Sequence, residues 1–295
     1  MSEDINDKRN PYISAEGQRE LHKSIIAFVD ILGFKELVRN AKNEGTSQKL
    51  FTDFHQVLST WFNRIEDLDK RMFIEGKKDS YKIRIFTDCI LIGCPIRKSG
   101  RNSNFIEGCN EFYEILSMLY IYQAEMVNHG YFIRGAIAVD ELYMDDVIIY
   151  GNSVTEAYET ESKQAKYPRI ILSKSAEAMF MQIDKSFSNQ EHENYLNPYL
   201  NRDSDGQLFL NYLESIKIGE SDYQFVGELE KHKQMVETNL SKYHDNPHIL
   251  EKYIWVANYH NCFCNQPPCY NDYRIDLTQY PMQPVTRRQP EDSSL

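Results

Sequence analysis

Two short apolar segments that each contain a single carboxylate constrain this chain most. Residues 28–34 read Phe-Val-Asp-Ile-Leu-Gly-Phe, and residues 85–91 read Ile-Phe-Thr-Asp-Cys-Ile-Leu. A charged Asp in a buried strand is strongly destabilising unless a positive charge lies beside it, and a divalent cation held by Asp30 and Asp88 would compensate for both charges. The pair therefore predicts a metal site. The alternative is that each Asp only begins a turn or caps a helix.

Gly33 favours the metal-site interpretation of the first segment. The strand ends in Asp-x-x-Gly, and apolar residues at helical spacing follow it. A helix that begins there leaves free backbone N–H groups near the carboxylate, and such an N-terminus binds phosphate.

Composition narrows the class of protein. A chain of 295 residues with 41% hydrophobic residues can bury a large core, which predicts a globular protein. The net charge of −11 argues against a broad nucleic-acid or anionic-membrane surface, because both need clustered Lys and Arg. The N-terminus is polar and no apolar run is long enough to span a bilayer, so we expect a cytoplasmic protein.

The six cysteines are too sparse for a disulfide scaffold. Cys262, Cys264 and Cys269 lie near His260 and leave a zinc site open as an alternative, although they lack the paired spacing of known zinc motifs. Residues 203–206 resemble the start of a calcium loop, but the required glutamate does not follow at the right distance, so we expect a turn.

Hydrophobic periodicity predicts alternating strands and helices up to about residue 172. The expected strands are 24–34, 81–94 (a pair or one long strand), 131–142, 147–150 and 169–172. The expected helices cover about 50–61, 112–123 and 151–166. This order predicts an α/β (α+β) sandwich, with helices on one or both faces of a mixed sheet.

The expected organisation is an N-terminal segment at 1–23, a catalytic domain at 24–175, a helical extension packed on it at 176–264, and an irregular, partly disordered tail at 265–295. Helical patterns occur near 174–183, 207–216, 225–241 and 247–260.

In this order the segments resemble the class III nucleotidyl cyclases, the adenylate and guanylate cyclase family. Residues 28–34 resemble the first metal motif of that family, and residues 82–88 resemble the second, which is usually Lys-x-x-Gly-Asp. Residues 133–137 are similar to the strand that carries a phosphate-binding Arg, and residues 151–154 with Ala157 and Glu161 are similar to the next helix start. The match covers about residues 24–175 and implies a cyclase-like mixed sheet with flanking helices.

Four departures from that family narrow the resemblance. Arg84 stands at the position of the purine-selecting Lys, Ile148 at that of the adenine-selecting Asp, Thr155 at that of the transition-state Asn, and Glu159 at that of the transition-state Arg. With residues 157–162, 167–170, 252–255 and 259–261, these departures resemble the pyrimidine cyclases of bacterial Pycsar anti-phage systems. That resemblance implies synthesis of cyclic UMP or cyclic CMP with manganese, as a signal that activates a separate effector.

The resemblance also implies the metal ligands. Asp30 would hold two ions, the Ile31 backbone carbonyl would hold one, and Asp88 would complete the site. Carboxylate and carbonyl oxygens suit Mn²⁺ or Mg²⁺ equally, and two such ions support in-line phosphoryl displacement.

Five further residues are candidates for binding the substrate. Arg134 would bind the β- or γ-phosphate, Arg84 the base edge, and Phe34 would line the nucleotide, while Lys163 and Lys166 would replace the missing transition-state cation. The alternatives are a surface strand residue for Arg134, a surface ion pair for Arg84, core packing for Phe34 and solvated helix residues for the two lysines.

Three functions stay open at this point. The first is a pyrimidine nucleotide cyclase that acts on UTP or CTP, the second a purine cyclase with unusual base contacts, and the third a cyclase-like sensor that binds nucleotide without turnover. We expect a head-to-tail homodimer, in which the metal pair of one chain meets the 151–166 helix of the other.

Overall fold

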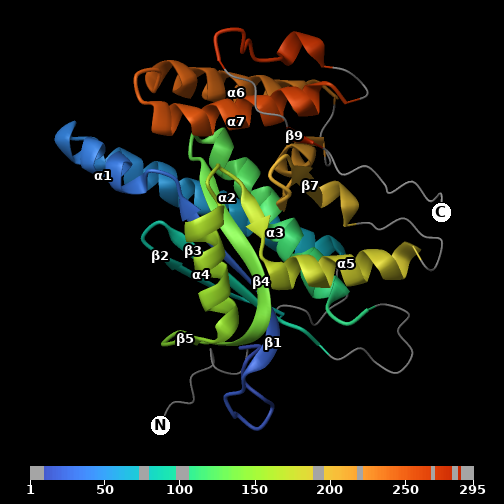
Figure 1. Ribbon diagram of the computed structural model, residues 1–295. Helices are drawn as coiled ribbons and strands as arrows, with labels where there is room; N and C mark the ends of the chain where they lie inside the picture. Colours follow the sequence, from blue (N-terminus) through green and yellow to red (C-terminus); the bar gives the residue numbers. More distant parts are fainter. Residues whose placement is uncertain are drawn as a thin grey trace.

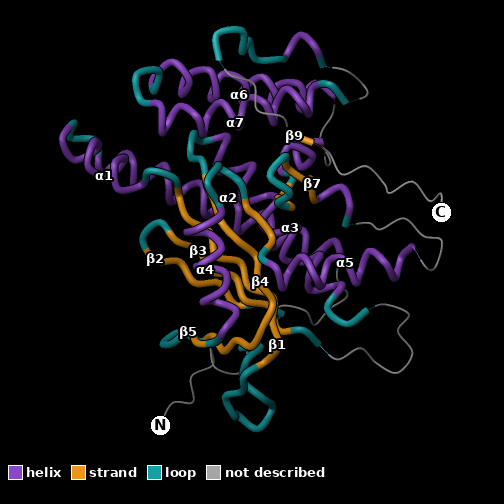
Figure 2. Tube along the Cα trace, in the orientation of Figure 1, coloured by secondary structure: helices purple, strands orange, loops and turns teal. Residues whose placement is uncertain are grey.

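The computed structural model describes residues 10–72, 80–97, 106–188, 196–217, 222–266, 270–280 and 285–286. They form one mixed β-sheet flanked by helices (Figures 1 and 2), which confirms the predicted mixed α/β class. The strands are β1 His22–Ile31, β2 Lys82–Phe86, β3 Cys89–Pro95, β4 Ile133–Met144, β5 Ile149–Tyr150, β6 Ile170–Leu172, β7 Leu200–Asp203, β8 Leu208–Leu210 and β9 Val285–Thr286. The α-helices are α1 Phe34–Asn43, α2 Ser47–Met72, α3 Cys109–Asn128, α4 Asn152–Gln164, α5 Lys174–Ser188, α6 Asp222–Lys242 and α7 Pro247–Cys264.

The sheet has the strand order β2-β3-β1-β4-β6-β8-β7-β9, and β5 pairs only with β4. The β4–β6 pair is parallel, and the other pairs in the described residues are antiparallel. The 81–94 region is a hairpin of two strands, which settles the alternative that the sequence left open.

β1 lies near the centre of the sheet and is buried on both faces, which explains its nearly continuous apolar sequence. One face, which includes Ile25 and Val29, packs in a core with residues of α2, α3 and α5. The other face, which includes Ile26 and Phe28, packs with Ala157 of α4. Figure 1 shows α4 crossing β4 on the side opposite α3.

Gly151 allows α4 to begin close to the sheet. Its φ is +148°, and a Cβ at this position would collide with the backbone carbonyl of Glu141 in β4. A larger residue would therefore push the helix start away from the strand.

The predicted helical extension needs a correction. Residues 207–216 do not form an α-helix: Leu208, Phe209 and Leu210 form strand β8, and a 3₁₀ helix follows at Tyr212–Lys217. A short, fully buried apolar run has no period that separates strand from helix. The sheet therefore continues past residue 175, into the part of the chain that we expected to be helical.

Part of the tail that we expected to be irregular is also ordered by contacts. The side chain of Asn261 accepts a hydrogen bond from the Ile275 N–H (2.8 Å) and donates to the Ile275 carbonyl (2.9 Å). Residues Val285 and Thr286 pair with β7. Residues 267–269, 281–284 and 287–295 lie outside the described residues, so the expectation for them is not tested.

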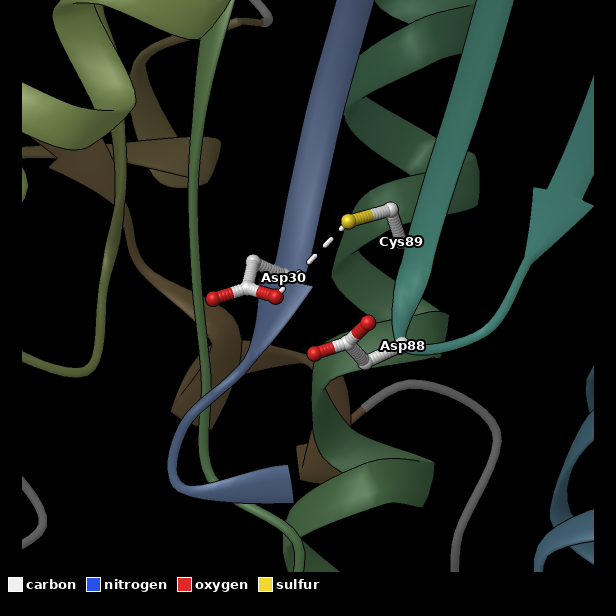
Figure 3. A group of neighbouring side chains, drawn as sticks. All are labelled: Asp30, Asp88 and Cys89. Atoms are coloured by element: carbon white, nitrogen blue, oxygen red, sulfur yellow. Dashed lines mark hydrogen bonds between the residues drawn. The ribbon is translucent and has the colours of Figure 1, made fainter. Parts of the chain in front are cut away.

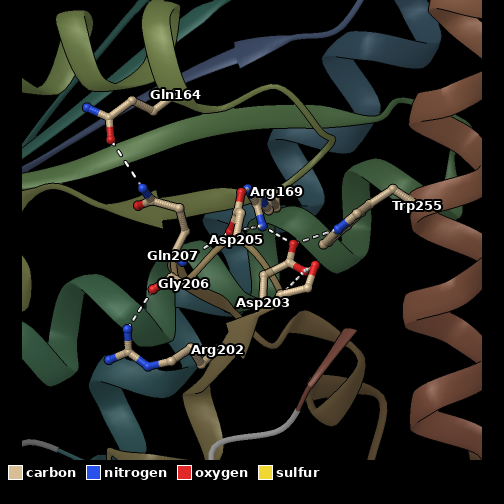
Figure 4. Close-up of polar contacts among 9 residues, drawn as sticks. Gln164, Arg169, Arg202, Asp203, Asp205, Gly206, Gln207 and Trp255 are labelled. Carbon is tan, nitrogen blue, oxygen red and sulfur yellow. Dashed lines mark hydrogen bonds and ion pairs between the residues drawn. The ribbon is translucent and has the colours of Figure 1, made fainter. Parts of the chain in front are cut away.

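A buried arginine joins α7 to the sheet. Arg169, directly before β6, is fully buried and forms ion pairs with Asp203 and Asp205, while the Trp255 Nε1–H of α7 donates to Asp203 Oδ2 at 2.7 Å (Figure 4). The Arg169 guanidinium lies 5.3–5.9 Å from the ring centres of Tyr167, Phe209 and Trp255. Residues 203–206 are thus a turn, as the sequence predicts, and their carboxylates bind an arginine.

Two buried histidines join α6 to α7. Tyr212 Oη lies 2.8 Å from His232 Nε2, His232 Nδ1 lies 3.0 Å from His260 Nδ1, and His260 Nε2 lies 2.8 Å from the Tyr273 carbonyl. Because a carbonyl only accepts, His260 carries its proton on Nε2, so His232 donates from Nδ1 and Tyr212 donates to His232. Burial lowers the pKa of both rings, that of His260 to about 4, so both imidazoles are neutral at pH 7.

The zinc alternative stays untested. Cys264 Sγ lies 3.5 Å from His260 Nε2, but Cys269 lies outside the described residues. The five described cysteines form no disulfide. No helix in the described ranges is long and apolar enough to cross a bilayer.

The buried arginine predicts a large effect on stability. Arg169→Met leaves Asp203 buried without its cation, so it should lower the free energy of unfolding by about 3–5 kcal/mol. Trp255→Phe removes one hydrogen bond to that carboxylate and should cost about 1–3 kcal/mol. Urea unfolding followed by circular dichroism measures both. Arg202→Met, which removes a partly exposed arginine of β7 that pairs with Glu177, is the control and should cost about 1 kcal/mol or less. An Arg169→Met protein as stable as the Arg202→Met protein would contradict this account.

Candidate metal centre

Two neighbouring strands and the turn of a hairpin bring three potential ligands together. Asp30 lies one residue before the end of β1, Asp88 lies in the β2–β3 turn, and Cys89 begins β3 (Figure 3). One ligand atom of each lies within 4.8 Å of the other two, and no other such group of His, Cys, Asp and Glu occurs in the described residues. The structure thus brings the two predicted carboxylates together.

The hairpin turn holds Asp88 in place. Thr87 has φ +53°, the left-handed conformation that a β-branched residue rarely adopts, and its Oγ1 donates to Asp88 Oδ1 at 2.7 Å. The Ile31 N–H donates to the Asp88 carbonyl at 3.2 Å, which ties the turn to β1. Thr87 stands where the cyclase motif usually has Gly, so the left-handed conformation at this position fits the resemblance.

The strand register places the site residues in one row across the sheet. Phe86 pairs with Cys89, Cys89 with Asp30, and Asp30 with Arg134 of β4, so all four share one face. Phe28 and Ala136 share this face too, which is the face covered by α4 farther along the strands. Asp30 and Arg134 therefore lie side by side on the sheet face that carries α4.

Arg134 lies between two carboxylates. Its Nε is 3.5 Å from Asp30 Oδ2 and 2.7 Å from Oε1 of Glu161, a buried residue of α4. With all groups ionised, Asp30, Asp88 and Glu161 carry three negative charges against one positive charge on Arg134, which leaves two negative charges. A divalent cation balances this excess.

The electrostatics of the site agree with that charge excess. Burial raises the pKa of Asp30, the charge of Asp88 raises it further, and Arg134 opposes both. Burial also raises the pKa of Glu161, against the effect of Arg134. Burial and the charges of Asp30 and Asp88 raise the pKa of Cys89 to about 12, so its thiol is neutral and its Sγ lies 3.7 Å from Asp30 Oδ1 as a weak donor.

The donor set fits a hard divalent cation. Two carboxylates on adjacent elements, next to the backbone of Ile31, are the oxygen ligands that Mg²⁺ and Mn²⁺ prefer. Cys89 offers a soft sulfur, which such hard ions do not prefer, and its thiol is a weak hydrogen-bond donor to Asp30.

Sequence reasoning gave no role to Cys89 or Glu161, the two other residues in contact with Asp30 or Arg134. Cys89 follows Asp88 directly, but its contact with Asp30 depends on a hairpin register that periodicity alone does not fix. Glu161 lies four residues after Ala157, on the buried side of α4, and a buried acid at helical spacing is the signal that would have found it.

Other predicted site residues have partners away from the two aspartates. Arg84 Nη1 pairs with Asp146 Oδ1 at 2.9 Å, which is the surface ion pair given as its alternative. The Phe34 ring packs against the Phe54 ring at the edge of the core, with the ring centroids 5.9 Å apart.

The two lysines of the 151–166 region are also paired. Lys163 pairs with Glu159 (3.0 Å), and Lys166 pairs with Glu251 of α7 (3.0 Å). Both side chains are more than half exposed. In this single chain Arg134 is the basic side chain that the structure pairs with Asp30.

Comparisons with known proteins give a distant similarity to solved structures. No protein-family model matches the chain, and neither does any curated protein. Among solved structures, the chain is similar to a class III adenylyl cyclase-like ATP-binding protein from Pseudomonas aeruginosa, with 13% identity, 53% of this chain covered and a TM-score of 0.36. The match spans 34% of that structure, so the roles of the site residues depend on the geometry given above.

Proposed function

We propose that this chain is a metal-dependent nucleotide cyclase that converts UTP or CTP into the 3′,5′-cyclic monophosphate and pyrophosphate. One observation carries the proposal. Carboxylate oxygens of Asp30 and Asp88 lie within 4.8 Å of each other on adjacent elements, and Arg134 lies beside Asp30. Acidic ligands for a cation next to a guanidinium suit a polyanionic substrate.

The reaction sets three requirements on the site. The ribose 3′-hydroxyl must lose its proton, its oxygen must bond to the α-phosphorus, and the bond from that phosphorus to the pyrophosphate oxygen must break. Divalent ions bound by Asp30, Asp88 and the Ile31 carbonyl would lower the pKa of the hydroxyl and neutralise the phosphates. Arg134, held by Glu161, would bind a phosphate oxygen and so orient the triphosphate.

The pyrimidine assignment depends on the sequence departures at Arg84 and Ile148. Arg84 lies on the same sheet face as Asp30, two residues along its strand from Phe86. Its guanidinium would have to exchange Asp146 for the base edge when substrate binds. Cyclic UMP or cyclic CMP would then serve as a second messenger in anti-phage defence and act on a separate effector, which stays a proposal from the resemblance, as does a cytoplasmic location.

A non-catalytic nucleotide sensor is the second candidate. Glu159, at the position of the transition-state Arg, pairs with Lys163, so this turn of α4 carries an ion pair where the cyclases carry a cation. Release of pyrophosphate separates the two candidates.

A homodimer is part of the proposal, and one surface supports it. Exposed apolar side chains gather on β2, the β4–β5 hairpin and α4; this hairpin patch consists of Phe86, Val147, Ile148, Tyr150 and Tyr158. The Arg84–Asp146 ion pair joins β2 to the hairpin, and Val147 is 92% exposed. Phe86 belongs to the same cross-strand row as Asp30, so a second copy seated on the patch would lie over the metal centre. That the 151–166 helix of the second copy supplies the missing cation is part of the proposal.

The metal ligands give the first functional prediction. Asp30→Ala and Asp88→Ala should each lower turnover to less than about 1% of wild type, because each variant removes a ligand rather than a packing group. Product formation with Mn²⁺, measured by mass spectrometry, tests this, and circular dichroism verifies the fold. Asp140→Ala, at the far end of β4, is the control and should keep wild-type turnover. Near wild-type turnover in either site variant would rule out the metal assignment.

Base choice is tested with the wild-type chain. Each of ATP, GTP, UTP and CTP is incubated with the protein and Mn²⁺, and products are identified by mass. We expect UTP or CTP to be cyclised at least about tenfold faster than either purine, because a site that hydrogen-bonds one base edge leaves polar groups unpaired with the wrong base. Efficient cyclisation of ATP would move the assignment to a purine cyclase, and nucleotide binding without pyrophosphate release would favour the sensor.

The dimer makes a separate prediction. Sedimentation of the wild-type chain should give a dimer, and Val147→Asp or Tyr150→Asp should give a folded monomer with little turnover, because a charge in an apolar interface opposes association. Phe51→Asp, at an exposed aromatic of α2 outside the patch, should leave both properties unchanged. A fully active wild-type monomer would exclude this arrangement.

A further inference from the structure

A cavity of about 190 Å³ lies between the start of α1 and the α6–α7 pair. Its lining includes Leu32, Gly33, Glu36, Lys242, Lys252 and Tyr253. Its near wall is the segment that directly follows Asp30 and Ile31. The cavity therefore lies next to the metal centre but is built partly from the C-terminal helices, beyond residues 24–175.

Phe132 connects α7 to the segment that follows Asp30. The Leu32 N–H donates to the Phe132 carbonyl at 2.8 Å, and the ring of Tyr253 packs edge-on against that of Phe132 with centroids 5.1 Å apart. Phe132 precedes Arg134 by two residues. Lys252 is thereby held beside the site, close enough that the charge of Arg134 acts on it.

The cavity has an excess of positive charge. Glu36, its acidic residue, pairs with Arg39 at 2.8 Å. Lys242 lies over the Tyr243 ring, with Nζ 5.1 Å from the centroid. Lys252 is half-buried and has no ion pair among the described residues. Burial and the charges of Arg134 and Lys166 lower the pKa of Lys252, and the charge of Glu251 opposes them only in part, so an anion in the cavity would relieve an existing repulsion.

Size and ring packing favour phosphate over a nucleobase. The aromatic faces are already in use, because Tyr243 stacks on Tyr253 with centroids 5.5 Å apart and an interplanar angle of 3°. The volume of 190 Å³ is below the range of about 300–1,000 Å³ that whole small-molecule ligands occupy, so it suits part of a ligand. The side-chain amide of Asn40 adds a donor at the wall.

We propose that this cavity binds the terminal phosphates of the nucleoside triphosphate and that Lys252 of α7 is the cation that holds them. The inference rests on the proposed function for the identity of the substrate, and it adds a residue of the C-terminal helices to the site. The C-terminal helices then form one wall of the substrate site, and the polyphosphate chain runs from the metal centre past Gly33 towards Lys252.

The test measures binding of inorganic tripolyphosphate to the full-length chain by isothermal titration calorimetry, with and without Mn²⁺. Wild type should bind tripolyphosphate, Lys252→Met should raise the dissociation constant about tenfold or more, and Lys252→Arg should recover most of the affinity. Lys231→Met, which removes an exposed lysine of α6 paired with Glu228, is the matched control and should bind as wild type does. Equal melting temperatures of the variants establish that the effect is not a loss of folding.

The outcomes separate this inference from the proposed function. If Lys252→Met binds tripolyphosphate as wild type does, or wild type does not bind it, the phosphate site is wrong. If tripolyphosphate binding depends on Lys252 but no triphosphate is cyclised, the phosphate site stands and the cyclase proposal fails. If nucleotide is cyclised and Lys252→Met leaves the KM unchanged, the cyclase proposal stands and the phosphate site fails. A nucleoside that competes with tripolyphosphate for wild type would place the base in the cavity and would also overturn the inference.

Discussion

The rest of the site depends on a carboxylate held near the end of a strand that is otherwise buried on both faces. Asp30 follows Val29 in the middle of the sheet, and burial together with Asp88 raises its pKa. Three groups lie beside this carboxylate: the Arg134 guanidinium, the Cys89 thiol and the carboxylate of Asp88. The remaining charge is negative, and this excess is the physical basis of the proposed divalent-cation site.

Buried contacts hold the C-terminal helices α6 and α7 beside this site. Arg169 joins β6, the β7–β8 turn and Trp255 of α7, and the His232–His260 chain joins α7 to α6. These buried contacts fix the position of α7, and the contact between Tyr253 and Phe132 brings it beside Arg134. A mobile helix pair could not hold Lys252 at a constant distance from the metal centre, whereas an anchored pair can.

Much of this fold could be predicted from hydrophobic periodicity and from the residues that end helices. β1 and α2, for example, have long, strongly patterned sequences, and the left-handed Gly130 marks the end of α3. β8 was expected to be helical, because three buried apolar residues give no period. The pairing of β9 with β7 joins residues more than 80 positions apart, and local sequence does not encode such a contact.

Part of the candidate site was predictable from the sequence as well. Asp30, Asp88 and Arg134 follow from motifs, and the structure brings them together. The partners of Arg84, Lys163 and Lys166 depend on which carboxylate lies nearest in three dimensions, so spacing could not identify them. Glu161 and Lys252 come from elements whose position over the sheet is set by packing, and only the three-dimensional structure shows their proximity to Arg134.

The most direct test of the central claim is the position of manganese in crystals of the full-length chain grown with Mn²⁺, read from anomalous scattering. The account predicts a peak within about 2.5 Å of carboxylate oxygens of both Asp30 and Asp88. A protein that shows no peak there, or that binds manganese only elsewhere, such as beside His260 and Cys264, would contradict the claim that these two carboxylates form a metal centre.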